Sequence, residues 1–102
     1  MSYARRVDDN QSDIVRQIRV IGGNRVTVYV TSSVGKGFPD IVVGCKHKDG
    51  TRRNYLFEIK DGNKQPSARR LTPDEKMFFD AWAGQVSVIY TADEALEIME
   101  II

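Results

Sequence analysis

Three strand-like segments follow one another without an intervening helix, and this order constrains the fold more than any other feature of the sequence. Residues 26–30 alternate valine with polar or aromatic residues, residues 41–43 are Ile-Val-Val, and residues 53–60 read Arg-Asn-Tyr-Leu-Phe-Glu-Ile-Lys. Such runs are typical of β-strands, and Lys48-Asp49-Gly50 is typical of a hairpin turn. The second and third segments are therefore expected to pair as antiparallel neighbours.

Helical patterns lie before and after these strands. Asn10 is expected to cap a first helix with Asp13 as its reciprocal acid, and Gly22-Gly23 to end it. The apolar side chains between them recur at helical spacing: Ile14, Val15, Ile18 and Ile21. Thr72-Pro73-Asp74-Glu75 has the composition of a capping box and should open a second helix, whose apolar stripe is Met77, Phe78, Ala81 and Trp82.

The C-terminal part adds a strand and a helix. Residues 85–90 alternate in strand fashion, and Thr91 with Glu94 should cap a last helix. Its expected apolar face consists of Ala95, Leu96, Met99 and Ile102. The order α-β-β-β-α-β-α predicts an α/β fold with a mixed sheet of about four strands flanked by helices.

Length and composition narrow the class of protein. A chain of 102 residues suits one domain, residues 1–102. One cysteine and one histidine exclude an internal disulfide and argue against a structural zinc site. We find no apolar run near the ~18 residues of a membrane span and no signal-peptide pattern at the N-terminus. A reducing cytoplasm is the expected location.

Charge is unevenly distributed although the formal net charge is only +1. Residues 44–70 carry eight Lys and Arg residues against three acids, whereas residues 71–102 carry one lysine against seven acids. Each run could be an ordinary solvated surface. The basic run could equally form a side that binds phosphate groups.

A Pro-Asp pair and an acid-x-Lys triplet occur twice in the sequence. One set is Pro73-Asp74 with Asp74-x-Lys76, and the other is Pro39-Asp40 with Glu58-x-Lys60. The predicted secondary structure shows which set can form a site. Asp74 and Lys76 fall in a helix, where residues two apart point in different directions. Glu58 and Lys60 fall in a strand, where residues two apart share a face. Asp40 directly precedes the neighbouring strand, so an antiparallel hairpin should bring it close to Glu58. These two carboxylates and the Lys60 amine are expected to meet at one end of the sheet.

This combination suits the hydrolysis of phosphodiester bonds. Hard divalent cations prefer oxygen ligands, which the Asp40 and Glu58 carboxylates and the Ile59 carbonyl could supply. Lys60 could position the attacking water or offset charge on the phosphate. A Glu-x-Lys strand can also be no more than a solvated face, and an aspartate before a strand can serve the turn alone.

Several cations flank the predicted site. Lys64, Arg69 and Arg70 follow the Glu58–Lys60 strand and could hold backbone phosphates. Lys36 lies between Gly35 and Gly37 and could contact a phosphate from a mobile loop, or could belong to a plain loop. Cys45 is expected to be a packing residue.

These residues resemble the PD-(D/E)xK nuclease superfamily, and more closely the small, stand-alone, phage-type members of its VRR-NUC branch. The resemblance covers roughly residues 8–91. The matching stretches are DNQxDIV at 9–15, GKGFPDIVVG at 35–44, YLFEIKDG at 55–62 and LTPDE at 71–75. The Pro-Asp and Glu-x-Lys pieces are short, but their order and context make the combination fairly specific.

The resemblance implies a restriction-endonuclease-like αβββαβ core that uses Mg²⁺ or Mn²⁺ to cut DNA. Asp40 and Glu58 would bind the metal and Lys60 would be the catalytic lysine. Similar domains carry a glutamate on the first helix, where this chain has Asp13; that residue could join the site or only cap the helix. Glu75 likewise could serve the site or a cap. Such proteins tend to form dimers, and residues 98–102 are one candidate interface; a phage protein would act in the host cytoplasm.

The sequence therefore favours a metal-dependent DNA endonuclease. Since no base-reading helix or zinc finger is visible, it should select DNA by shape, as in branched or junction DNA. The alternative is a non-catalytic nucleic-acid-binding module that retains the fold. A third possibility is an interaction protein that docks a partner through the acidic segment 92–100.

Overall fold

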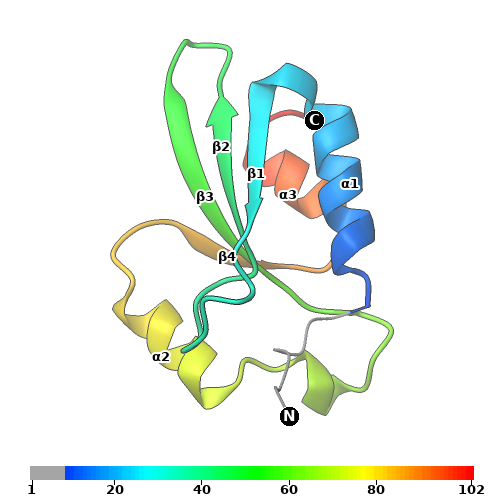
Figure 1. Cartoon of the computed structure of the whole chain (residues 1–102), viewed down its shortest axis with the longest axis vertical. Helices are drawn as coiled ribbons and strands as arrows, with labels where there is room; N and C mark the ends of the chain where they lie inside the picture. Colours follow the sequence, from blue (N-terminus) through cyan, green and yellow to red (C-terminus); the bar gives the residue numbers. More distant parts are fainter. Residues whose placement is uncertain (1–8) are drawn as a thin grey trace.

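The computed structural model describes residues 9–102, and its elements follow the predicted order α-β-β-β-α-β-α (Figure 1). Two short 3-10 helices, η1 and η2, are added to that order. The elements are α1 (Gln11–Gly22), η1 (Gly23–Arg25), β1 (Val26–Val30), β2 (Ile41–Lys46), β3 (Arg52–Ile59), η2 (Pro66–Arg69), α2 (Pro73–Ala81), β4 (Val86–Ile89) and α3 (Ala92–Ile98). The predicted fold class is confirmed.

The four strands form one mixed sheet in the order β1-β2-β3-β4. β1 and β3 each pair antiparallel with β2, and β4 pairs parallel with β3. The predicted hairpin turn joins β2 to β3: the Gly50 N–H donates to the His47 carbonyl at 3.0 Å, and Asp49 Oδ1 accepts from the Thr51 N–H at 2.9 Å. This turn fixes a register in which Ile41 faces Phe57.

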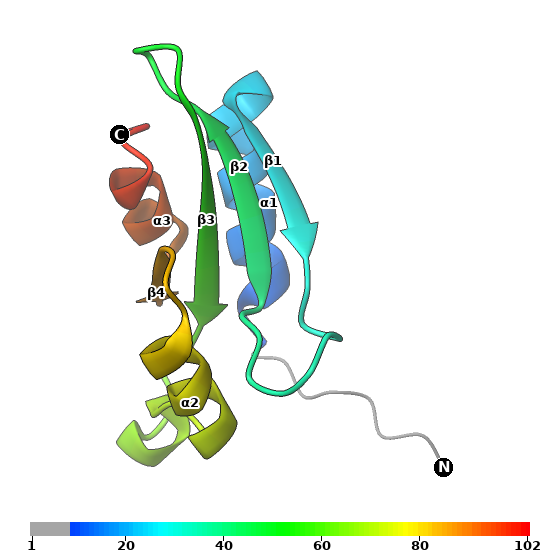
Figure 2. The ribbon, with the colours of Figure 1, turned by 90° about the vertical axis from the view of Figure 1, so that its left-hand side faces the viewer.

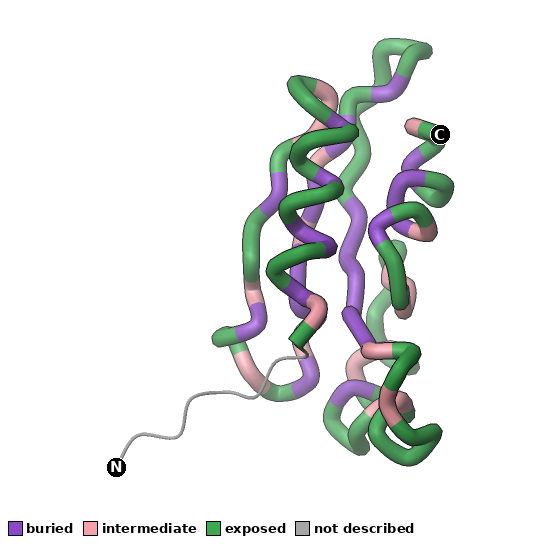
Figure 3. The backbone as a smooth tube through the Cα atoms, turned by 90° about the vertical axis from the view of Figure 1, so that its right-hand side faces the viewer, coloured by how far each residue is buried: buried purple, intermediate pink, exposed green. Residues whose placement is uncertain are grey.

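Helices α1 and α3 cover one face of the sheet, where α1 packs against β1 and α3, and α3 packs against β4. Figure 2 shows α1 behind the strands, and Figure 3 shows buried segments alternating with exposed ones along both helices. The core residues from the sheet are Val28, Ile41, Val43, Cys45, Tyr55, Phe57, Ile59 and Ile89. The apolar core therefore lies on one side of the sheet only, and α3 is part of it.

The first helix departs from its prediction at both ends. Asn10 stands at the N-cap, but its side chain makes no capping hydrogen bond; its Nδ2 instead donates to the Lys60 carbonyl at 3.3 Å. Asp13 pairs with Arg16 at 3.2 Å rather than with the cap. Ile21 is exposed, because the inward face of α1 ends with Ile18 and Gly22.

Helix α2 begins with the predicted capping box, but its predicted apolar stripe is wrong. Met77 is 69% exposed and Trp82 is 42% exposed, and Glu75 is the only residue of the helix that is buried. The reason is position: α2 lies beyond the end of the sheet (Figure 2), where Phe78 contacts Phe38 of the β1–β2 loop at a centroid distance of 5.3 Å. The helix is thus attached to a loop and not to the core.

The last helix is shorter than predicted. α3 ends at Ile98, and Glu100 adopts a positive φ of 60°, which turns the chain out of the helix. Ile101 consequently packs against the core, and Ile102, expected on the apolar face, is 59% exposed. Across residues 9–102 we find no helix with the length and apolarity that crossing a membrane requires.

Candidate active site

The β2–β3 hairpin brings Asp40 and Glu58 together. Ile41 faces Phe57, so the residue before β2 lies beside the residue that follows Phe57 in β3. Both carboxylates are buried, with 5% and 3% of each residue exposed. Asp40 Oδ2 accepts a hydrogen bond from the Ile59 N–H at 2.8 Å, which fixes the Asp40 side chain at the end of β3.

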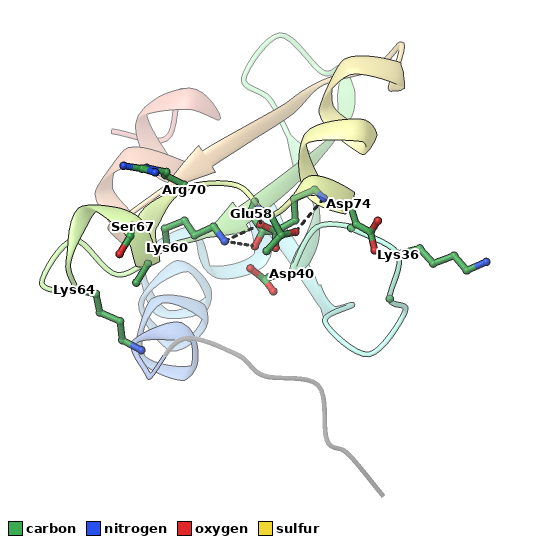
Figure 4. A pocket seen from close by; sticks show the side chains of 13 residues that line it. Lys36, Asp40, Glu58, Lys60, Lys64, Ser67, Arg70 and Asp74 are labelled. Atoms are coloured by element: carbon green, nitrogen blue, oxygen red, sulfur yellow. Dashed lines mark hydrogen bonds and ion pairs between the residues drawn. The ribbon is translucent and has the colours of Figure 1, made fainter.

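Lys60 completes the group from the same side of β3 as Glu58. Its Nζ lies 3.7 Å from Glu58 Oε2 and donates to Glu75 Oε1 at 2.8 Å. Figure 4 shows the Lys60 amine pointing at these carboxylates, with Asp40 next to them. The structure therefore places Asp40, Glu58 and Lys60 at one point, and adds Glu75.

Glu75 has two contacts that arise from the start of α2. Its Oε1 accepts from the Thr72 N–H at 2.9 Å, and Thr72 Oγ1 accepts from the Glu75 N–H at 3.2 Å, which is the capping box. The same Oε1 receives the Lys60 amine. The cap thus fixes the carboxylate that holds the lysine, so Glu75 serves the helix and also belongs to the site.

The group contains three carboxyl groups, those of Asp40, Glu58 and Glu75, but only one amine, that of Lys60. Burial raises the pKa of Glu58 to about 10, with further contributions from a hydrogen bond to Asp40 and from the negative charges of Asp40 and Glu75. Burial also acts to raise the pKa of Glu75, but hydrogen bonds from Lys60, the Thr72 backbone and Glu58 outweigh it and lower that pKa. No donor among residues 9–102 reaches the buried Oε1 of Glu58. Lys60 is thus the cation beside Glu58, on the side of Oε2, and Oε1 is left without a hydrogen bond, which is unfavourable for a buried polar atom.

An open pocket of about 670 Å³ gives access to this group. Its wall includes the four residues above and three further cations, Lys36, Lys64 and Arg70. Figure 4 shows the charged ends of these three side chains directed outward, away from the carboxylates. The remaining wall residues are Gly35, Gly37, Ser67, Ala68, Thr72 and Asp74. Negative charge thus lies at the floor of the pocket and positive charge at its margin.

Three of the predicted site residues are not in the wall of this pocket: Ile59, whose side chain is part of the core, Asp13 and Arg69. The Asp13 side chain is 70% exposed, pairs with Arg16, and lines a separate pocket of about 360 Å³ beside Asn10 and Asp61. Arg69 is not part of the main pocket wall, and its Nε is buried without a hydrogen-bond partner among the described residues. Asp13 points elsewhere because it lies on the outer side of α1.

Three residues near the site were not anticipated. Asn10 holds the Lys60 carbonyl, and Ser67 and Asp74 line the pocket. Asp74 and Lys76 do diverge as the helical geometry requires, since Lys76 pairs with Asp80 at 3.3 Å, but Asp74 and Glu75 in the first turn of α2 both line the pocket. The LTPDE match was the available signal for Asp74, whereas no local pattern indicates the contact of Asn10.

A divalent cation needs several oxygen ligands, and the site supplies only a few of them. The described residues contain no group of three or more His, Cys, Asp and Glu side chains placed to hold a metal ion. Asp40 and Glu58 give two carboxylates. The Ile59 N–H points toward Asp40, while the next N–H, that of Lys60, points to β4; because alternate residues of a strand face opposite neighbours, the Ile59 carbonyl also faces Asp40. Two carboxylates, one carbonyl and water are a set that Mg²⁺ accepts.

Comparison with known proteins adds no assignment: no family model matches the chain, and neither a curated protein nor a solved structure is similar to it. The class of protein is therefore defined by the fold and the site. It is an α/β protein whose mixed sheet carries a buried cluster of carboxylates and one lysine at one end, within an open pocket.

Proposed function

We propose that this protein is a divalent-metal-dependent DNA endonuclease. The observation that carries the proposal is the convergence of Asp40, Glu58 and Lys60 in one pocket, together with a Glu58 oxygen that meets no donor among the described residues. A buried carboxylate oxygen without a donor is costly, and a bound cation would offset that cost. The sequence resemblance to the VRR-NUC branch favours the same function.

Asp40, Glu58 and the Ile59 carbonyl would hold Mg²⁺ or Mn²⁺. When bound, such a cation lowers the pKa of a coordinated water and offsets negative charge on a phosphate. Asp40 is prepared for this role because the Ile59 N–H occupies only its Oδ2 atom. Glu58 is prepared because its burial disfavours the free carboxylate.

Lys60 would stabilise the phosphate or orient the attacking water. Its amine is held 2.8 Å from Glu75 and 3.7 Å from Glu58, so its position depends on side chains and not on solvent. A positioned ammonium stabilises charge that develops in the transition state without a cost of reorganisation. Glu75 is a positioning residue in this proposal, since it acts through Lys60.

DNA is the proposed substrate because the pocket margin carries cations. Lys36, Lys64 and Arg70 surround the carboxylates and could contact phosphates on both sides of the bond to be cut. Phosphate contacts report the shape of the backbone and not the base sequence, so we expect selectivity for branched or junction DNA.

A homodimer is the proposed assembly, since two copies would place two sites on two strands. Ile98 and Ile102 are 40% and 59% exposed near the C-terminal end and could form part of the interface. The proposed location is the cytoplasm, which suits the buried free thiol of Cys45.

The test is cleavage of supercoiled plasmid and of four-way junctions with Mg²⁺ or Mn²⁺. We expect metal-dependent cleavage by the wild type and a loss of about 10³-fold in rate for Asp40→Ala and for Lys60→Ala. Asp13→Ala and Lys76→Ala are matched controls that should retain activity, because both side chains lie outside the pocket. Cleavage that survives Asp40→Ala would refute the proposal, and DNA binding without cleavage in any metal would favour a binding module.

A further inference from the structure

The face of the sheet opposite α1 and α3 carries side chains that face solvent. Figure 2 shows β1, β2 and β3 side by side in front of α1, with α2 beyond their lower end. Along this face Tyr29 is 71% exposed, and Thr27, Lys46, Arg52 and Asn54 are exposed as well. Asp40, Glu58 and Lys60 lie on the same face, at the end nearest α2.

Two cations face each other at the far end of this face. The register sets Lys46 directly opposite Arg52, and both residues are exposed. Like charges directly opposite each other destabilise a sheet. Among the described residues, no acid pairs with Lys46 or Arg52. The fold alone gives no reason for this pair.

The acids of this part of the chain lie on the other side of the sheet. Helix α3 carries Asp93, Glu94 and Glu97, and it packs on the covered face. The next acid, Glu100, faces Arg53 and His47 at 3.7 Å each. At this end of the sheet the acids of α3 thus lie behind the strands, whereas Asp40 and Glu58 lie at the opposite end of the open face. The end that carries Lys46 and Arg52 has the charge that a polyanion requires.

The middle of the open face is flat and uncharged. A Cβ placed on Gly44 would meet nothing nearer than Asn54 Oδ1, at 3.9 Å. Thr27 and Gly44 face each other across the strands, and Gly44 faces Asn54 in turn. Glu58 lies six residue positions after Arg52, which corresponds to roughly 20 Å of strand. A duplex that rises ~3.4 Å per base pair spans that length in about six base pairs.

We propose that this open face binds the double-stranded arm of the DNA substrate, with Lys46 and Arg52 contacting the backbone about six base pairs from the bond that is cut. The proposal rests on the proposed nuclease function, because the carboxylate end of the face defines where the cut falls. Both residues belong to the basic run of residues 44–70, and neither lies in the wall of the pocket. The site would thus extend from the pocket along the length of the hairpin.

The test compares Lys46→Gln/Arg52→Gln with Arg16→Gln/Lys76→Gln, a control that removes the same charge from ion pairs outside this face. Binding to a 24-base-pair duplex is measured by fluorescence anisotropy in Ca²⁺ over a range of salt. The first variant should bind about tenfold more weakly, and the slope of log K against log salt should fall by about 2, since each lost phosphate contact removes ~0.9. The control should keep the wild-type slope. The melting temperature of the first variant should not fall, because a repulsive pair is removed.

Three results would overturn the proposal. Equal slopes for both variants, with cleavage intact, would reject the open face as a DNA surface and leave the proposed nuclease function standing. A shift of the first variant from dimer to monomer in analytical ultracentrifugation, with DNA affinity unchanged, would show that the face joins two copies of the chain. A wild-type protein that neither binds nor cuts DNA would reject both proposals.

Discussion

At the residue scale, Glu58 carries a large electrostatic cost. Burial and the Asp40 and Glu75 carboxylates raise its pKa to about 10, far above the value of 4.5 for a free glutamate. A raised folded-state pKa means that the folded protein binds this proton more tightly than the unfolded chain. The stability from neutral Glu58 is present below about pH 4.5 and is lost as pH rises toward 10.

Replacement of Glu58 by glutamine should therefore stabilise the protein without metal at alkaline pH. The amide cannot ionise, so we expect a gain of roughly 2–4 kcal/mol at pH 8 and little change at pH 4. The melting temperature in EDTA should rise by roughly 10–30 °C at pH 8. Glu97→Gln, at an exposed position of α3, serves as the control and should change the melting temperature equally at both values of pH. An equal shift for Glu58→Gln at pH 4 and pH 8 would contradict the assigned cause.

Lys36 combines a strained backbone conformation with a place in the wall of the proposed site. Its φ is 55°, and the Phe38 N–H donates to the Gly35 carbonyl at 3.1 Å, so Lys36 and Gly37 form a tight turn with positive φ at both central positions. Asparagine is favoured there and lysine is not. Strain that persists beside a site is a sign of function.

We expect Lys36→Asn to stabilise the fold by about 0.5–1 kcal/mol and to weaken DNA binding several-fold, because it relieves strain and removes a cation. Lys36→Gln is the matched control: it removes the same charge without the preference for positive φ. The two variants should bind DNA equally weakly, and chemical denaturation should show the gain for asparagine alone. Unchanged binding in both would remove Lys36 from the DNA surface.

At the element scale, two helices begin with the same capping box, and only one of them faces the site. Thr72 and Glu75 open α2, and Thr91 and Glu94 open α3 with the same reciprocal hydrogen bonds. Both boxes satisfy backbone N–H groups that would otherwise lack partners. Glu75 differs from Glu94 in that it also holds Lys60.

This pair allows the structural role of Glu75 to be separated from its role in the site. Glu75→Gln and Glu94→Gln should each cost about 0.5–1 kcal/mol in denaturant unfolding, since both weaken a cap. Glu75→Gln should in addition lower the cleavage rate by about 10- to 100-fold and shift its pH profile, because Lys60 loses its charged partner. If both variants cleave DNA at the wild-type rate, Glu75 is a cap and nothing more.

The sequence predicted the order of elements because periodicity and caps are local properties. The hairpin turn and the register it fixes were also local, and they were sufficient to bring Asp40 near Glu58. The packing of α2, in contrast, depends on a contact with a residue that is distant in the sequence. Its Phe78 meets Phe38 from a loop far away in the sequence, and the rest of the stripe that resembled a core face is exposed.

The same reason explains the errors at single positions. Asn10 has the composition of a cap, but a contact fifty residues away, to the Lys60 carbonyl, takes its side chain. Asp13 lies on a helix whose rotation is set by Ile14, Val15 and Ile18 in the core, and this leaves it outside the pocket. Ile102 falls outside the core because Glu100 ends the helical path. In each case a tertiary contact or a backbone angle decided the outcome.

At the scale of the whole molecule, the fold sets a buried, negatively charged group at one end of a small sheet, where it weakens the folded state. A ligand that binds only the folded state stabilises it by about 2.7 kcal/mol at 100 times its dissociation constant. For a domain of this size, that corresponds to a rise in melting temperature of roughly 10–20 °C. A cation held by Asp40 and Glu58 should therefore be visible in the stability of the protein even without DNA.

We expect Mn²⁺ to raise the melting temperature of the wild type, and to raise it more at pH 8 than at pH 6, because the cation competes with the proton that burial favours on Glu58. Asp40→Ala should abolish the rise, and Glu58→Gln should reduce it while starting from a higher melting temperature. Asp13→Ala should behave as wild type, since its side chain lies outside the pocket. Differential scanning calorimetry with EDTA, Mg²⁺ and Mn²⁺ measures all four proteins in one series. A rise that survives Asp40→Ala would place the cation elsewhere on the surface, and the carboxylate pair would then need a different explanation.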